Sequence, residues 1–181
     1  NSAYLSWEAR YRLEQGDSLD LRTIPSAVGG NPEKRKGIIL AKSIPAKAYG
    51  VQTGEPLVSA FQKCRALVVV PANFRLYKRC SKELTDLLYN YSPKIQSFSI
   101  DESFVDMGRL DDPMATANEL REDVEKTLGF TVNVGVGPNK LLAKMASDFK
   151  KPNRAHSLFK EEIPTKLWPL PVGELFMVGR K

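Results

Sequence analysis

Two adjacent carboxylates, Asp101 and Glu102, have the clearest potential for chemistry in this 181-residue sequence. They interrupt a run in which apolar and serine residues alternate, which is the period of a half-buried strand pair. The alternating residues are Phe98, Ile100 and Phe104 against Ser97, Ser99 and Ser103. At a hairpin tip, successive carboxylates can converge, and convergent oxygens suit a hard cation such as Mg²⁺. Turn chemistry alone also favours Asp, so this stretch by itself leaves both interpretations open.

Composition and charge bound the class of protein. Hydrophobic residues make up 42% and charged residues 27%, which predicts a packed globular core. The 27 basic and 21 acidic side chains give a net charge of +6, which favours a polyanionic partner, nucleic acid first. No apolar run reaches membrane-spanning length and no signal-peptide pattern is present, so we expect a cytoplasmic protein with no membrane partner.

The cysteine and histidine contents exclude several kinds of site. Cys64 and Cys80 are widely spaced in apolar surroundings, which predicts buried free thiols in a reducing compartment. His156 is the only histidine, so the sequence excludes a His-rich zinc site and argues against a Ser-His-Asp triad.

The sequence predicts short helices and strands in the first part of the chain. A helix begins after Ser2, which can serve as its N-cap, and a hairpin and further short segments follow. The expected segments are strands over 24–30 and 37–41, helices over 43–50 and 58–64, and a strand over 67–70 closed by Pro71.

The second part has longer helices. The periodicity predicts a helix over 74–91, the acidic hairpin, a helix over 115–128 capped by Gly129, a strand over 130–136 and a helix over 140–149. The predicted inward faces are Phe74, Tyr77, Cys80, Leu84, Leu87 and Leu88, then Ala117, Leu120, Val124 and Leu128. With one strand upstream of Asn1, the order becomes β-α-β-β-α-β, an α+β fold with a ferredoxin-like palm.

Several segments together resemble the Y-family (DinB/UmuC-like) translesion DNA polymerases. Three resemble palm motifs: Ser99 to Asp106, Val134 to Ser147, and Lys151 to Asn153. Three more resemble the fingers and the return to the palm: Val28 to Gly30, Ala46 to Val51, and Val68 to Pro71. The resemblance implies palm over 1–12 and 72–158, a small fingers insertion over 13–71, and the start of a helical thumb over 159–181.

The resemblance also implies a function. It is template-directed, low-fidelity nucleotidyl transfer from a deoxynucleoside triphosphate to a primer 3′-hydroxyl, with primer-template DNA as partner, in a bacterial, nucleoid-associated protein. Asp101 and Glu102 would be the catalytic metal ligands for two Mg²⁺ ions. Tyr4 would be the steric gate under the sugar, Lys47 and Lys151 would contact the triphosphate, and Lys140 and Lys144 would face DNA phosphates.

The sequence departs from the family pattern at several points, one of which is Ala41, where a hydroxyl residue often stands. The first metal-binding aspartate of the family would lie two residues before Asn1, so we expect an incomplete metal site and an inactive fragment. Ile44 stands where many members carry a tyrosine, and Lys47 replaces a phosphate-binding arginine, which loses the bidentate geometry. Most of the thumb and the C-terminal DNA-gripping domain are not in this sequence, and a sliding clamp would be contacted through a region outside it.

Two alternative functions involve the same palm fold. The expected incomplete metal site and Ile44 favour a non-catalytic DNA-binding or partner-binding module with a polymerase-like palm. A nucleotidyl cyclase on the same palm fold lacks support, because its motifs are absent from the sequence. Gly135 to Lys140 lacks the ending and spacing of a P-loop and is better interpreted as a strand-to-helix turn.

Overall fold

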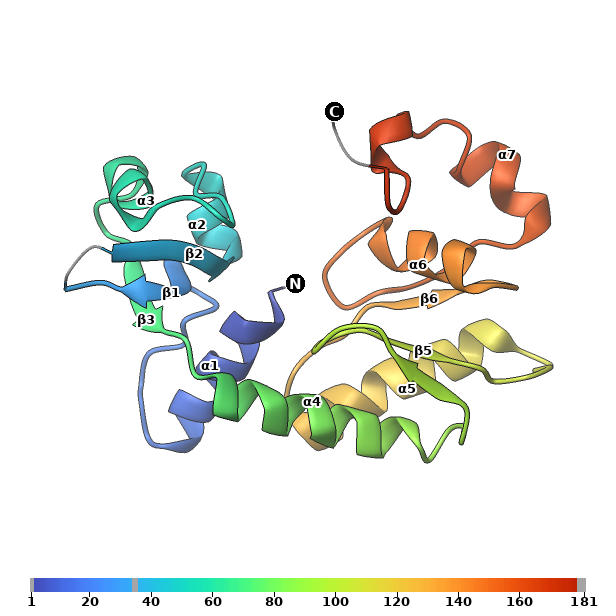
Figure 1. Ribbon diagram of the computed structural model, residues 1–181. Helices are drawn as coiled ribbons and strands as arrows, with labels where there is room; N and C mark the ends of the chain where they lie inside the picture. The colour runs from blue at the N-terminus through green and yellow to red at the C-terminus, as the bar shows by residue number, and fades with distance from the viewer. Residues whose placement is uncertain (1, 34–35, 179–181) are drawn as a thin grey trace. The chain divides into compact units, whose positions relative to one another are not determined.

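The computed structural model describes residues 2–33 and 36–178 of an α+β chain, as the sequence predicted (Figure 1). The chain divides into two compact units, and the boundary between them along the sequence falls within one long helix. The N-terminal unit spans Ser2–Glu83 and the C-terminal unit begins at Leu84. Asn1, Lys34, Arg35 and residues 179–181, the end of the expected thumb segment, lie outside the described residues.

The N-terminal unit contains one three-stranded sheet and several short helices. Its elements are α1 (Ala3–Glu14), β1 (Ser26–Asn31), β2 (Lys36–Lys42), α2 (Ile44–Ala48), α3 (Leu57–Lys63), β3 (Val68–Pro71) and the first part of α4 (Phe74–Leu88). Each expected segment is present within a few residues of its predicted bounds. Ser2 occupies the N-cap position of α1, but its side chain makes no capping hydrogen bond, so that expectation is only partly confirmed.

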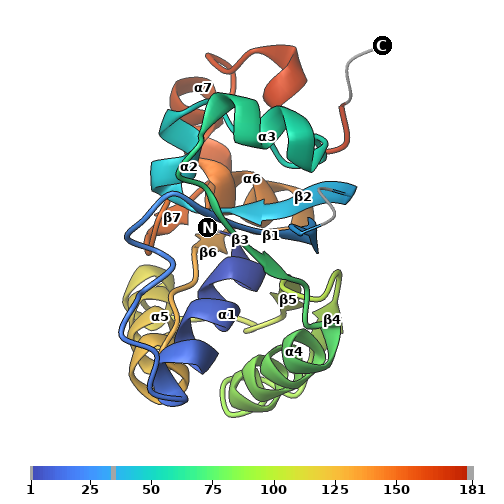
Figure 2. The same ribbon diagram turned by 90° about the vertical axis from the view of Figure 1, so that its left-hand side faces the viewer.

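The sheet of this unit has the strand order β2-β1-β3. Strand β1 pairs antiparallel with β2, which confirms the predicted hairpin, and parallel with β3. Helices α2 and α3 lie on one face of this sheet (Figures 1 and 2). The core between them is made of small and branched side chains, chiefly Ala27, Ile39, Ala46, Leu57 and Ala60.

The C-terminal unit contains two short sheets and the remaining helices. After the end of α4, its elements are β4 (Ile95–Ser97), β5 (Ser103–Val105), α5 (Pro113–Leu128), β6 (Val134–Val136), α6 (Lys140–Asp148), β7 (Ala155–Ser157), η1 (Lys160–Glu162), α7 (Ile163–Lys166) and η2 (Val172–Glu174). From α4 onward the order helix, strand, strand, helix, strand is confirmed.

The acidic hairpin has shorter strands than predicted. Strands β4 and β5 pair antiparallel, but the register ends at Ser97 and Ser103. Residues 98–102, here called the acid loop, connect them. The backbone N–H groups of Phe98 and Ser99 both donate to the carbonyl of Glu102, at 2.9 and 3.1 Å. Because these bonds close the loop, the alternation of Phe98 and Ile100 does not continue the strand, and that part of the prediction was wrong.

Strands β6 and β7 form a parallel pair between two helices. Val134, Gly135 and Val136 lie opposite Ala155, His156 and Ser157. Helix α6 lies on one side of this pair and α5 on the other (Figure 1). The predicted strand over 130–136 is shorter because only its last residues have β7 beside them, and β7 itself was not predicted from the sequence.

Gly135 allows the close approach of α6 to β6. A Cβ at this position would lie 1.9 Å from the Ala143 carbonyl oxygen and 2.5 Å from the Ser147 nitrogen. Only a residue without a side chain fits there. The glycine therefore fixes how closely α6, which carries Lys140 and Lys144, lies over the strand.

The helix faces largely follow the predicted periodicity. The inward residues of α5 are buried as expected, and Gly129 adopts a left-handed conformation with φ 67° at its C-cap. In α4 the expected apolar face is buried except for Phe74, which is 52% exposed, whereas Leu76 is buried. Cys64 and Cys80 are buried free thiols, as predicted. Throughout the described ranges, no helix is long and apolar enough to span a membrane.

Candidate metal and nucleotide site

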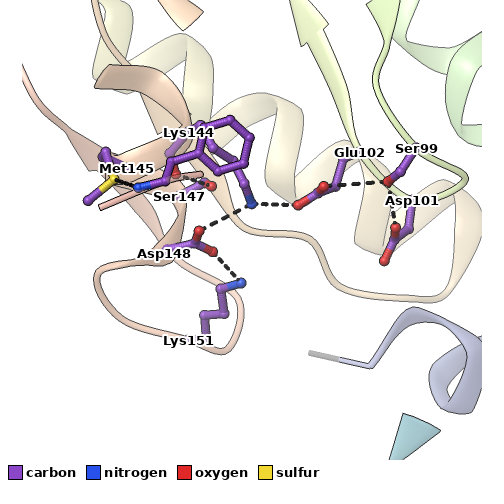
Figure 3. Close-up of polar contacts among 9 residues, drawn as sticks. Ser99, Asp101, Glu102, Lys144, Met145, Ser147, Asp148 and Lys151 are labelled. Atoms are coloured by element: carbon purple, nitrogen blue, oxygen red, sulfur yellow. Dashed lines mark hydrogen bonds and ion pairs between the residues drawn. The ribbon is translucent and has the colours of Figure 1, made fainter. Parts of the chain in front are cut away.

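The two carboxylates of the acid loop converge on one hydroxyl group. Ser99 Oγ lies 2.9 Å from Asp101 Oδ1 and 3.4 Å from Glu102 Oε2 (Figure 3). A hydroxyl has a single proton to donate, so the shorter contact to Asp101 is the stronger hydrogen bond. Asp101 is exposed and Glu102 is half-buried. The hairpin therefore brings both carboxylates to one accessible point, as the sequence predicted.

Glu102 is also part of a chain of alternating charges. Its Oε1 lies 2.5 Å from the ammonium of Lys144, whose side chain is only 13% exposed. The same ammonium lies 3.1 Å from Asp148 Oδ2, and Asp148 Oδ1 lies 2.6 Å from Lys151. Figure 3 shows these contacts running from the acid loop to the segment after α6.

The contacts among these charged side chains shift the pKa values of Lys144 and Asp148. Burial acts to lower the pKa of Lys144, but hydrogen bonds to Glu102 and Asp148 outweigh it and raise that pKa above its ordinary value. Burial acts to raise the pKa of Asp148, but hydrogen bonds from Lys151 and Lys144 lower it below its ordinary value. Both groups therefore carry their charges at neutral pH.

Helix α6 presents its lysines toward the hairpin. Its N-cap is Asn139, whose side chain accepts a hydrogen bond from the Leu142 backbone at 2.9 Å. The Lys140 ammonium contacts the side-chain oxygen of Gln96 on β4 and lies 5.9 Å from the centre of the Phe104 ring. Lys140 and Lys144 are thus both engaged within the protein, and their expected contact with DNA phosphates remains a prediction.

Aromatic contacts support the acid loop from the C-terminal segment. The Phe98 ring packs edge-on against Phe104 and Phe176, with both centroid distances 5.7 Å. The Phe176 backbone donates a hydrogen bond to the sulfur of Met145 on α6 at 3.2 Å. These contacts join the hairpin, α6 and the end of the described chain in one cluster.

Lys151 lies in a segment that is anchored to α5. Asn153, with φ 52°, accepts a hydrogen bond from Arg121 at 2.9 Å and donates one to Glu125 at 2.8 Å. These contacts fix the backbone two residues beyond Lys151. The segment therefore presents the Lys151 ammonium beside Asp148 rather than free in solvent.

In the N-terminal unit, Tyr4 belongs to an aromatic cluster. Its ring stacks on Tyr77 with a centroid distance of 4.5 Å and an interplanar angle of 15°, and it meets Trp7 and Phe74 at 6.1 Å each. The side chain is only partly buried. This packing fits both a rigid steric gate and an ordinary core aromatic residue, so its role remains a prediction.

Lys47 lies on the short helix α2, which Ser43 caps by accepting a hydrogen bond from the Ala46 backbone at 3.0 Å. The Lys47 side chain is exposed, and Ile44 on the same helix is 66% exposed. An exposed apolar side chain beside an exposed lysine can meet a planar or charged ligand, but nothing in the fold assigns one.

The acid loop supplies the type of ligand atom that Mg²⁺ prefers, but too few ligands for a complete site. Asp101 and Glu102 supply hard anionic oxygens, the ligands that Mg²⁺ prefers. Across residues 2–33 and 36–178, no three His, Cys, Asp or Glu side chains are gathered as a metal site. The carboxylate pair thus fits part of a metal site, with the Lys144 cation already on one of its oxygens.

Sequence reasoning missed two participants. Asp148 has a recognisable signal, because it lies four residues after Lys144 on the same helix and three before Lys151, and both spacings place opposite charges side by side. Ser99 gave no such signal, since its role depends on the conformation of the loop rather than on spacing.

Comparison with known proteins identifies the family. Residues 1–148 match the impB/mucB/samB family. This chain belongs to the impB/mucB/samB family. It corresponds to the N-terminal region of Y-family DNA polymerase IV, as the resemblance indicated.

Two curated bacterial proteins illustrate the similarity of this impB/mucB/samB chain to its relatives. It is 47% identical over 183 residues to DNA polymerase IV of Clostridium acetobutylicum, covering 99% of the chain and 46% of the relative. It is 41% identical over 186 residues to DNA polymerase IV 1 of Bacillus subtilis, covering 100% of the chain and 43% of that protein. The chain therefore spans just under half the length of these two relatives.

Solved structures of the same family share the fold. A Y-family DNA polymerase chimera of Dbh and Dpo4 matches with a TM-score of 0.85 and 26% identity, over 99% of this chain and 53% of that one. DinB from Sulfolobus solfataricus matches with a TM-score of 0.84 and 25% identity, over 98% and 52%. An insertion ternary complex of Dbh DNA polymerase matches with a TM-score of 0.83 and 25% identity, over 98% and 52%.

Proposed function

We propose that this chain is the palm and fingers portion of a low-fidelity translesion DNA polymerase. The observation that carries the proposal is the convergence of Asp101 and Glu102 on Ser99 in a chain of this family. The order of α4, β4, β5, α5 and β6 supports a ferredoxin-like palm, with fingers over 13–71 and the start of the thumb over 159–181.

The proposed reaction is in-line nucleotidyl transfer. The primer 3′-oxygen attacks the α-phosphorus of a deoxynucleoside triphosphate, a new P–O bond forms, the bond to the bridging oxygen breaks, and pyrophosphate leaves. The hydroxyl proton passes to solvent. Two bound Mg²⁺ ions would favour the ionised 3′-oxygen and neutralise charge on the pyrophosphate.

The residues of this chain have distinct proposed roles. Asp101 and Glu102 hold metal from the acid loop, and the half-exposed Lys151 provides a cation for the triphosphate. Tyr4 excludes a ribose 2′-hydroxyl, while Lys47 contacts the triphosphate from α2. Because two carboxylates are too few for two ions, we expect these 181 residues alone to bind Mg²⁺ weakly and to extend no primer.

Primer extension by the full-length protein tests the proposal. Asp101→Asn and Glu102→Gln should each reduce the extension rate by at least about a hundredfold. Each substitution removes an anionic ligand of the Mg²⁺ ions that stabilise the charge of the transition state. Asp111→Asn is the matched control, since it removes an exposed carboxylate from a loop of the same unit. Extension by Asp101→Asn at the wild-type rate would contradict the assignment.

A non-catalytic module is the second candidate, and the exposed Ile44 on α2 favours it. Such a protein would bind primer-template DNA without extending it. Primer extension together with a DNA-binding measurement separates the two functions. If the wild-type full-length protein binds DNA but extends no primer at any Mg²⁺ or Mn²⁺ concentration, the result supports the module.

A further inference from the structure

In this structure, a protein cation already occupies Glu102. Its Oε1 is 2.5 Å from Lys144, and its Oε2 is 3.4 Å from Ser99 Oγ. A divalent cation that binds both carboxylates of the acid loop would therefore share Glu102 with the Lys144 ammonium.

Two cations cannot share this carboxylate without cost. Like charges held close together repel each other, and the repulsion is larger when one of them is divalent. Lys144 is 13% exposed, so solvent screens its charge less than that of a surface lysine. The ammonium thus opposes binding of a metal ion for as long as it stays on Glu102.

Asp148 provides Lys144 with a second acceptor. Asp148 Oδ2 lies 3.1 Å from the ammonium, and both residues belong to α6, so this contact does not depend on the acid loop. Asp148 contacts Lys151 through its other oxygen. Lys144 can therefore leave Glu102 without becoming a buried, unpaired charge, which would be strongly unfavourable.

We propose that Lys144 is the resident counter-cation of the carboxylate pair, that a divalent cation binding Asp101 and Glu102 displaces it from Glu102, and that Asp148 then retains it. The inference rests on the proposed function of the carboxylate pair. In this proposal Lys144 is a positioning residue, which lowers the affinity of the carboxylate pair for free divalent cations.

Binding of Mn²⁺ to the purified full-length protein, followed by electron paramagnetic resonance of the free ion, tests this. Lys144→Met should bind Mn²⁺ at least about fivefold more tightly than wild type, because the competing charge is gone. Lys144→Arg keeps the charge and should bind as wild type does. Lys126→Met, which removes an exposed lysine from α5, controls for net charge.

The outcomes distinguish this inference from the proposed function. Equal or weaker Mn²⁺ binding by Lys144→Met, or no detectable binding by any variant, overturns the inference. If Glu102→Gln binds Mn²⁺ as wild type does, the carboxylate pair is not the metal site and the proposed function fails as well. Circular dichroism checks each fold, and Lys144→Gln replaces Lys144→Met if that variant does not fold.

The role of Asp148 has its own test. Asp148→Asn should weaken Mn²⁺ binding in the wild-type background, because Lys144 then has only Glu102 as an anionic partner. In the Lys144→Met background the same substitution should have a clearly smaller effect, since no ammonium remains to be retained. Equal fold-changes in the two backgrounds would show that Asp148 acts only through its own charge, and would overturn this part of the inference.

Discussion

The Tyr77 hydroxyl donates a hydrogen bond of 2.9 Å to the Glu8 carboxylate, and both side chains are buried. The bond joins α4 to α1 inside the N-terminal unit. Burial, together with the contact to Glu8, raises the pKa of the Tyr77 phenol well above its ordinary value. Arg12 is a second partner of Glu8, but its Nε is 3.7 Å away.

Removing this hydroxyl should destabilise the protein. Tyr77→Phe leaves a buried carboxylate short of a donor, which costs about 1–3 kcal/mol in the free energy of unfolding. Urea denaturation followed by circular dichroism measures the change. Tyr89→Phe, at a 55% exposed site, should have almost no effect. Equal stabilities for the two variants would show that the Glu8 contact contributes nothing.

Stability at high pH should depend on Tyr91. Burial and the nearby Asp123, which accepts its hydrogen bond at 3.2 Å, raise the pKa of Tyr91 to about 12. The native state keeps the proton where the unfolded state loses it, so this contribution is complete below about pH 10 and disappears as the pH rises through about 12. Tyr91→Phe should flatten that part of the stability profile, measured by urea denaturation at several pH values.

Gly135→Ala should disrupt the packing of α6 on β6. The added methyl group would meet the Ala143 carbonyl and the Ser147 nitrogen far inside contact distance. The overpacking should lower the free energy of unfolding by about 1–3 kcal/mol or more. Gly173→Ala is the control, because nothing lies within 4 Å of its added Cβ. A melting temperature unchanged in Gly135→Ala would mean that α6 can shift freely.

Tyr4→Ala should relax sugar selection by the full-length protein if Tyr4 is the steric gate. Loss of the ring should raise ribonucleotide incorporation relative to deoxyribonucleotide incorporation by at least about tenfold in single-turnover assays. Tyr4→Phe keeps the ring and its stacking on Tyr77, and should preserve selection. If both variants discriminate as wild type does, Tyr4 is a core aromatic residue with no role in selection.

Lys151→Met should weaken triphosphate binding by the full-length protein. Loss of one charge-assisted contact should raise KM for the deoxynucleoside triphosphate about tenfold. Lys150→Met removes a neighbouring exposed ammonium and should leave KM close to wild type. A similar rise in both variants would point to a general electrostatic effect instead of a specific contact.

The sequence predicts the helices better than the loop conformation. The inward face of α5 follows directly from its periodicity, because a long amphipathic helix repeats its signal over several turns. Phe98 gives a misleading signal, because its alternation with the neighbouring serines is the pattern of a strand, whereas its backbone N–H donates to the Glu102 carbonyl within the loop.

The candidate site shows a similar limit. Asp101 and Glu102 stand out by residue type, and Asp148 could have been found from helical spacing. The contact of Phe98 with Phe176 joins residues far apart in the chain, and such packing has no local pattern. Interactions between distant segments therefore had to come from the structure.

Two main-chain hydrogen bonds close the acid loop. Both closing hydrogen bonds run to the Glu102 carbonyl, which every residue type possesses, and neither involves a carboxylate. The two hydrogen bonds that close this hairpin therefore do not require the negative charges of Asp101 and Glu102. A lineage could exchange these acids for neutral residues and keep both hydrogen bonds, so the path of the main chain alone would not reveal whether the carboxylates are present.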